Sequence, residues 1–122
     1  MSGEAFAAFP SLLAYGDGGF RFADGRREGS VLVVGDAVAA WSLTRLEDAA
    51  PADFDAVFAA DPRPDFLLLG AGPRMARAPE PVRDRFRAEG VGLEVMDTGA
   101  ACRLYATLMG EGRRFAAALI AV

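Results

Sequence analysis

Two uninterrupted apolar segments in the second half of the chain constrain the fold most. Phe66–Leu69 and Phe115–Ile120 contain no polar side chain, which is typical of strands that are covered on both faces. Segments of helical length, Pro79–Glu89 and Thr98–Gly110, lie between them, with a further strand at Val91–Met96. Strands that alternate with helices of about ten residues predict a layered α/β domain. The apolar character of the last strand places it near the centre of the sheet.

Local signals mark the ends of the helices. Pro51 suits the first turn of a helix, because its missing N–H costs no hydrogen bond there. Gly90 and Gly110 stand where a left-handed residue ends a helix. The Thr98 hydroxyl is expected to cap the last helix. The apolar spacing predicts that this helix buries a stripe made of Ala101, Leu104, Tyr105 and Leu108.

The first half of the chain is rich in β-strand signals. Gly and Asp residues at 16–19 and 23–25 indicate turns on either side of Phe20–Phe22. Ser30–Val34 and Ala37–Trp41 are joined by Gly35 and Asp36, which predicts a hairpin. The chain is therefore expected to form a mixed sheet with helices on both faces and an attached N-terminal β-hairpin or meander.

The length bounds the organisation of the chain. With 122 residues, a single domain that buries about two-thirds of its surface is expected. This domain is expected to comprise residues 1–122, with residues 1–10 as a flexible N-terminus.

Several residue types are missing, and their absence excludes common chemistries. The 13 basic residues are all arginine, there is no histidine, and Cys102 is the single cysteine. A Ser–His–Asp triad, a lysine Schiff base, an internal disulfide and a cysteine or histidine zinc site are all excluded. We expect no catalytic residue, no cofactor and no metal.

The net charge of −4 argues against a nucleic-acid partner, which requires a basic face. The longest apolar run, Phe115–Val122, is too short to cross a bilayer. The first residues carry neither the basic start of a secretory signal nor the arginines of a transit peptide. These features favour a cytoplasmic location.

Two strand-to-helix junctions are candidate binding sites. The first is the loop of Gly70, Gly72 and Arg74, where backbone N–H groups and a guanidinium suit an anion. The second is Asp97–Thr98, and in an open α/β sheet such junctions lie side by side at a crevice. Each has a structural alternative, namely a tight turn with a surface arginine and an ordinary helix cap.

Other chemistry-bearing residues allow two interpretations. Cys102 near a helix start is either a reactive thiol or a small buried apolar residue. Arg103, Glu111 and Arg113 form either a structural ion pair or an interaction cluster. Trp41 is either a core residue or an interface anchor.

A resemblance to a known family rests on longer stretches. Residues 94–105 read Glu-Val-Met-Asp-Thr-Gly-Ala-Ala-Cys-Arg-Leu-Tyr, and residues 111–120 read Glu-Gly-Arg-Arg-Phe-Ala-Ala-Ala-Leu-Ile. With residues 29–33, Trp41 and the 70–72 loop, they resemble a small-domain family long described as of unknown function. Its eukaryotic members include a mitochondrial complex I assembly factor (NADH dehydrogenase alpha subcomplex assembly factor 3) and an adipogenesis-associated protein. The resemblance extends from about Leu12 to Ile120.

The resemblance implies a three-layer α/β fold with a mixed central sheet and no established enzyme activity. It also implies protein partners, among them respiratory-complex subunits or membrane-insertion machinery. Two positions depart from the family pattern. Ala71 replaces the usual Thr between the glycines, and Ala106 replaces the usual Asn after the tyrosine. Both changes remove a polar side chain near the expected crevice.

Three hypotheses follow. The first is a non-catalytic assembly or interaction protein. The second is a small-molecule or anion-binding domain that uses the crevice between residues 70–74 and residues 97–98. The third is an enzyme that uses Asp97, Cys102 or Arg103.

Overall fold

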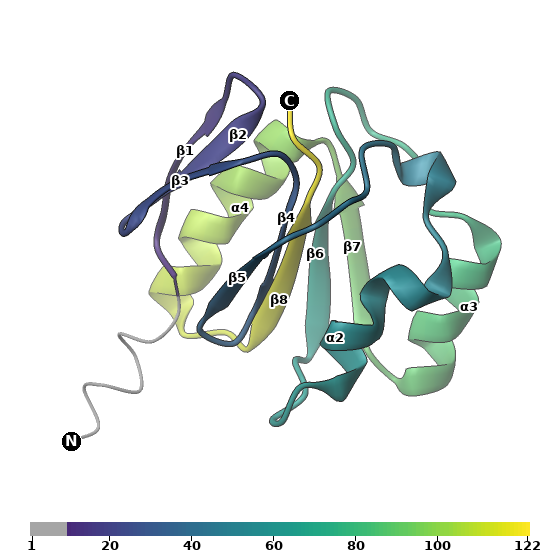
Figure 1. Ribbon diagram of the computed structural model, residues 1–122. Coiled ribbons are helices and arrows are strands. Elements are labelled where there is room, and N and C mark those ends of the chain that lie inside the picture. Colours follow the sequence, from purple (N-terminus) through teal and green to yellow (C-terminus); the bar gives the residue numbers. More distant parts are fainter. Residues whose placement is uncertain (1–9) are drawn as a thin grey trace.

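The computed structural model describes residues 10–122, which form two sheets and several helices (Figure 1). The flexible N-terminus expected for residues 1–10 falls, apart from Pro10, outside the described residues. The strands are β1 (Leu12–Gly16), β2 (Gly19–Phe22), β3 (Gly25–Glu28), β4 (Val31–Val34), β5 (Ala37–Ala40), β6 (Phe66–Gly70), β7 (Gly92–Met96) and β8 (Phe115–Leu119). The α-helices are α2 (Asp55–Ala59), α3 (Glu80–Glu89) and α4 (Thr98–Glu111), and short 3₁₀ turns lie at Leu46–Asp48 and Pro51–Phe54.

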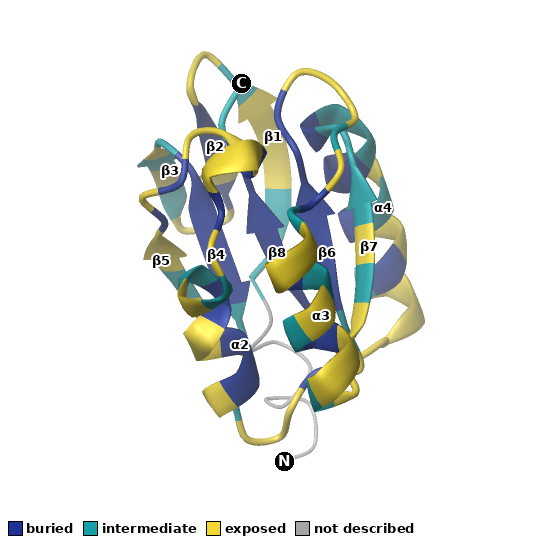
Figure 2. Cartoon of the chain, turned by 90° about the vertical axis from the view of Figure 1, so that its right-hand side faces the viewer, coloured by how far each residue is buried: buried dark blue, intermediate teal, exposed yellow. Residues whose placement is uncertain are grey.

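The larger sheet is mixed, with strand order β5-β4-β8-β6-β7. β6 runs parallel to both β8 and β7, whereas β4 runs antiparallel to β8 and β5. All five residues of β8 are buried, and its central position confirms the expectation from its apolar sequence. Figure 2 shows β4, β8 and β6 buried between the more exposed edge strands β5 and β7. The mixed α/β fold expected from the sequence is therefore present.

One face of this sheet is covered by α2 and α3 (Figure 1). Edge-to-face aromatic contacts connect Trp41 to Phe54, Phe54 to Phe86, and Phe86 to Phe58. Trp41 is buried, and its indole N–H donates to the Asp53 carbonyl over 3.0 Å. The prediction that Trp41 belongs to the core is confirmed.

The other face is covered by α4 and by the small antiparallel sheet β1-β2-β3 (Figure 1). Phe20 and Phe22 of β2 pack in this layer with Tyr105 of α4 and Phe115 of β8. Strands β1 and β2 are joined by Asp17 (φ 54°) and Gly18 (φ 78°), the left-handed pair typical of a type I′ hairpin turn. The domain thus has three layers, as the family resemblance implied.

The structure corrects the ends of α4. Thr98 does not cap the helix; Asp97 does, because its Oδ2 accepts a hydrogen bond from the Ala100 N–H at 3.1 Å. The helix also continues past Gly110 and ends at Gly112, which takes the left-handed conformation (φ 67°). Leu104, expected in the buried stripe, is only half-buried.

Two further elements differ from expectation. The helix expected to begin at Pro51 forms as a 3₁₀ turn followed by the five-residue α2. β3 was not predicted at all, because its sequence Gly-Arg-Arg-Glu has no apolar alternation. No helix within residues 10–122 is long and apolar enough to cross a membrane.

Candidate functional site

The two junctions singled out in the sequence lie side by side, because β6 and β7 are parallel neighbours with Gly70 opposite Met96. Thr98 connects them. Its Oγ1 accepts a hydrogen bond from the Gly72 N–H over 2.9 Å and donates one to the Ile120 carbonyl over 2.7 Å. Its own N–H donates to the Gly72 carbonyl over 2.8 Å. We call this arrangement of Gly70, Gly72, Thr98 and Ile120 the Thr98 junction.

The Thr98 junction is closely packed. Thr98 is fully buried. A Cβ atom at Gly70 would lie 3.0 Å from Thr98 Oγ1 and 3.1 Å from Leu119 Cδ2. Glycine therefore suits the close approach of β6 to α4, since a Cβ would press on Thr98 and Leu119. The threonine hydroxyl connects three segments of the chain.

The remaining residues predicted for an anion site lie around this junction. Asp97 is half-buried, and its carboxylate is engaged in capping α4. Arg74 is exposed in the loop beyond Gly72, and no hydrogen bond or ion pair within residues 10–122 holds its guanidinium. The structure brings Gly70, Gly72 and Thr98 into contact and leaves Arg74 at the surface. Ligand binding at these residues stays a prediction.

A more open surface lies between β1 and the first turns of α4. A hollow of about 340 Å³ is lined there by Leu12, Leu13, Ala14, Tyr15, Cys102, Arg103 and Ala106. We call it the β1–α4 groove. Leu13 is 61% exposed and Tyr15 is 41% exposed, which makes them two of the three exposed large apolar side chains within residues 10–122. Ala106, one of the two departures from the family pattern, lies in this groove and keeps its wall apolar.

The position of the Tyr15 side chain in the groove depends on a glycine. A Cβ atom at Gly99 would lie 2.7 Å from the Tyr15 hydroxyl oxygen and 3.3 Å from Asp97 Oδ2. Gly99 therefore allows the Tyr15 ring to lie against the first turn of α4. The aromatic side chain thereby lines part of the hollow.

Cys102 in the groove wall is a packing residue. It is only 7% exposed, and this burial raises the pKa of its thiol to about 12, although the positive charge of Arg103 acts in the opposite direction. The thiol is therefore protonated at neutral pH, and only the thiolate is a good nucleophile. The geometry favours the apolar interpretation of Cys102.

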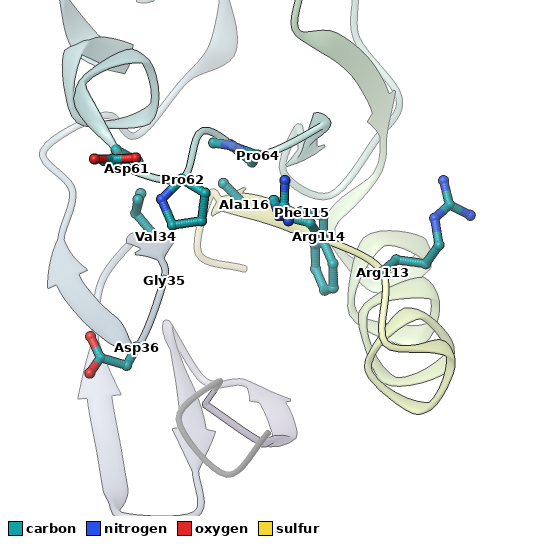
Figure 3. A pocket seen from close by; sticks show the side chains of 11 residues that line it. Val34, Gly35, Asp36, Asp61, Pro62, Pro64, Arg113, Arg114, Phe115 and Ala116 are labelled. Carbon is teal, nitrogen blue, oxygen red and sulfur yellow. The ribbon is translucent and has the colours of Figure 1, made fainter. Parts of the chain in front are cut away.

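The sequence did not indicate a second hollow at the opposite end of the large sheet. It has a volume of about 350 Å³ and is lined by residues 34–36, 60–62, 64 and 113–116. Figure 3 shows Asp36 and Asp61 on one side of this hollow and the Arg113 side chain on the other. Three turn segments that are distant in the sequence form its wall, so no local sequence motif predicts this hollow.

The structure pairs two members of the predicted cluster of Arg103, Glu111 and Arg113 with each other. The Arg113 guanidinium nitrogen lies 3.9 Å from a Glu111 carboxylate oxygen. The guanidinium carbon lies over the Phe66 ring, 5.3 Å from the ring centroid. Arg103 instead lines the β1–α4 groove. Within residues 10–122 no group of three or more histidine, cysteine, aspartate or glutamate side chains is arranged to hold a metal ion.

Comparison with known proteins gives a consistent family. Residues 12–120 match the family described as "Protein of unknown function (DUF498/DUF598)". An uncharacterized protein of Rhodobacter capsulatus is 36% identical over 94% of this chain and 87% of its own length. The human NADH dehydrogenase [ubiquinone] 1 alpha subcomplex assembly factor 3 is 30% identical over 88% of this chain. The chain spans only 58% of the length of that human protein.

Solved structures share the fold. A Bartonella henselae protein described as an outer membrane protein superposes with a TM-score of 0.84, at 33% identity, over 93% of this chain and 98% of its own. A Bordetella pertussis protein described as a Mth938-like domain superposes with a TM-score of 0.78, at 28% identity, over 93% and 86% of the two chains. The architecture is therefore common to proteins with quite different descriptions.

Proposed function

Because this chain belongs to the DUF498/DUF598 family, we propose that it is a non-catalytic protein-interaction domain that assists the assembly of a respiratory complex. Its partners would be subunits of the respiratory NADH dehydrogenase or components of the membrane-insertion machinery, which it would meet from the cytoplasm. The shared region supports this proposal, since the match to the human assembly factor includes 88% of the chain.

The observation that carries the proposal is the exposed apolar surface along β1. Leu13 and Tyr15 stand 61% and 41% exposed beside a hollow, and exposed apolar patches next to polar residues are typical of protein-binding sites. A tyrosine and an arginine, Tyr15 and Arg103, belong to the residue types enriched among the anchors of protein interfaces.

A deletion strain tests the proposal. We expect loss of the gene to lower the amount of assembled NADH dehydrogenase, measured on native gels with an in-gel activity stain. Re-expression of the wild-type chain restores it. A tagged chain recovered from its native host brings down subunits of the complex or insertion components. Normal complex levels in the deletion strain contradict the proposal.

The second candidate function is an anion or small-molecule site at residues 70–74 and 97–98. The observation that favours it is the side-by-side placement of the two junctions, with the Arg74 guanidinium unpaired within residues 10–122. We expect a thermal shift with nucleotides or acidic metabolites that Arg74→Gln abolishes. A flat screen against such compounds contradicts this second function.

A further inference from the structure

Within residues 10–122, β1 has a free edge, because in the order β1-β2-β3 it has a strand partner on one side only. The two-residue turn places Gly16 opposite Gly19 and Tyr15 opposite Phe20. The regular pairing holds next to the turn, and the register shifts between Leu12 and Ala14. In such a hairpin the pair next to the turn exchanges hydrogen bonds and the following pair does not. The backbone N–H and C=O of Tyr15 therefore point away from β2, toward the open edge.

The hollow lies beside this same strand. Four consecutive residues of β1, Leu12–Tyr15, line it on one side, and Cys102, Arg103 and Ala106 of α4 line it on the other. A strand that pairs with β1 would direct alternate side chains toward α4. The hollow of about 340 Å³ gives apolar side chains of moderate size a place there.

The charge of the groove is positive, in contrast to the chain as a whole. Arg103 is exposed, and its guanidinium has no hydrogen-bond or ion-pair partner within residues 10–122. The chain has a net charge of −4, whereas the charged side chain among the residues that line this hollow is the arginine Arg103. A carboxylate is its natural partner, because the arginine fork forms charge-assisted paired hydrogen bonds with it.

We propose that the β1–α4 groove binds an extended apolar segment of a partner protein, which adds to the free edge of β1 as a fourth strand and places one Asp or Glu on Arg103. Main-chain hydrogen bonds to β1 supply affinity, and the hollow and Arg103 supply selectivity, as in other strand-addition complexes. This inference rests on the proposed function, because it specifies the partner surface of a protein-interaction domain. A strand is favoured over a lipid tail because only a peptide uses the outward backbone groups of Tyr15.

Selection from a displayed library of random twelve-residue peptides tests the proposal, with the full chain as bait. We expect the selected peptides to alternate apolar and polar positions and to carry one Asp or Glu. Arg103→Glu should weaken their binding at least tenfold in fluorescence anisotropy, and exchanging the peptide acid for Lys should restore it. Ala106→Trp, which fills the hollow, should abolish binding. Methylation of alternate backbone amides of the peptide should also abolish binding, because it removes the N–H groups that would form main-chain hydrogen bonds to β1.

Arg77→Glu is the matched control, since Arg77 is also exposed and unpaired within the described residues but does not line the groove. It should bind like the wild type. Circular dichroism verifies that each variant folds, and the methylated peptides test the proposal on the unaltered chain. No selected sequence, peptides with helical spacing, or binding unaffected by Ala106→Trp overturns the proposal. Binding of oleate that Ala106→Trp blocks, without any selected peptide, overturns it in favour of a lipid carboxylate.

The deletion strain separates this inference from the proposed function. If groove peptides bind as expected but complex levels are normal without the gene, the assembly role fails and the groove stands. If the deletion lowers complex levels and both Arg103→Glu and Ala106→Trp restore them fully, the assembly role stands and the groove proposal fails.

Discussion

The N-terminal half of α4 meets β-structure in two contrasting ways. At the Thr98 junction, a buried hydroxyl and backbone groups of three segments satisfy one another at distances of 2.7–2.9 Å. Along the β1–α4 groove, as far as residues 10–122 show, one strand edge is open, two large apolar side chains are exposed and an arginine is unpaired. The first region therefore contributes to stability, whereas the exposed apolar side chains and the arginine of the second region can contact another molecule. Mutations should separate these two properties.

The largest expected effect is on stability, at Thr98. Thr98→Val keeps the shape but removes the hydroxyl, which leaves the Gly72 N–H and the Ile120 carbonyl buried without this partner. Each unsatisfied buried group costs about 1–3 kcal/mol, so we expect the free energy of unfolding to fall by roughly 2–4 kcal/mol. Urea denaturation followed by circular dichroism measures it.

Thr107→Val is the control for that substitution. Thr107 is exposed on α4, and its hydroxyl donates only to the Arg103 carbonyl of its own helix. We expect a change of less than about 0.5 kcal/mol. Equal losses in the two variants would contradict the special role given to the Thr98 hydroxyl.

A pair of glycine substitutions in opposite directions gives the next largest effect. Gly70→Ala forces a Cβ to within 3.0 Å of Thr98 Oγ1, and such overpacking costs about 1–3 kcal/mol. Gly110→Ala adds a methyl group inside α4 where nothing lies within 4 Å. It should stabilise the protein by about 0.5–1 kcal/mol. The same denaturation curves check both signs, and a stabilising Gly70→Ala would show that the junction is looser than described.

The fold was accessible from the sequence where one interaction dominates. The apolar content of β6 and β8 placed them inside the sheet, and the Gly35–Asp36 turn identified the β4–β5 hairpin, because burial and turn chemistry act locally. The strand β3 could not be predicted, because edge strands tolerate charged side chains and its Arg-rich sequence shows no apolar alternation. The end of α4 was misplaced by two residues since Gly110 and Gly112 are equivalent locally.

The sites were harder to predict than the fold. Asp97 and Thr98 are both good capping residues, and only the tertiary structure shows that Thr98 has buried partners on two other segments. Parallel pairing of β6 and β7 did make the meeting of the two junctions predictable. The β1–α4 groove was not predictable, because Leu12–Tyr15 and residues 102–106 are far apart in the chain and neither contains a motif.

Gly99→Ala should displace the Tyr15 side chain in the groove at little cost in the free energy of unfolding. The added Cβ would lie 2.7 Å from the Tyr15 hydroxyl, which is the end of a partly exposed and rotatable side chain. In contrast to Gly70, the neighbour can move, so we expect a loss of no more than about 1 kcal/mol. The NMR resonances of the Tyr15 ring should shift, while those of the Trp41 indole in the opposite core stay unchanged. Unchanged Tyr15 resonances would show that Gly99 does not determine the position of the Tyr15 ring in the groove.

The smallest expected effect concerns the Cys102 thiol in the groove wall, and it tests whether solvent and reagents reach the sulfur atom. Burial raises the pKa of Cys102 from 9.0 to about 12, so the unfolded chain loses this proton at lower pH than the folded one. The stabilisation from keeping the thiol neutral is therefore present below about pH 9 and is lost as the pH rises toward 12. We expect the free energy of unfolding to decline less steeply above pH 9 in Cys102→Ala than in the wild type. At pH 8 a thiol reagent should label the native chain far more slowly than the urea-unfolded chain, and equal labelling rates would mean that the groove opens down to the sulfur.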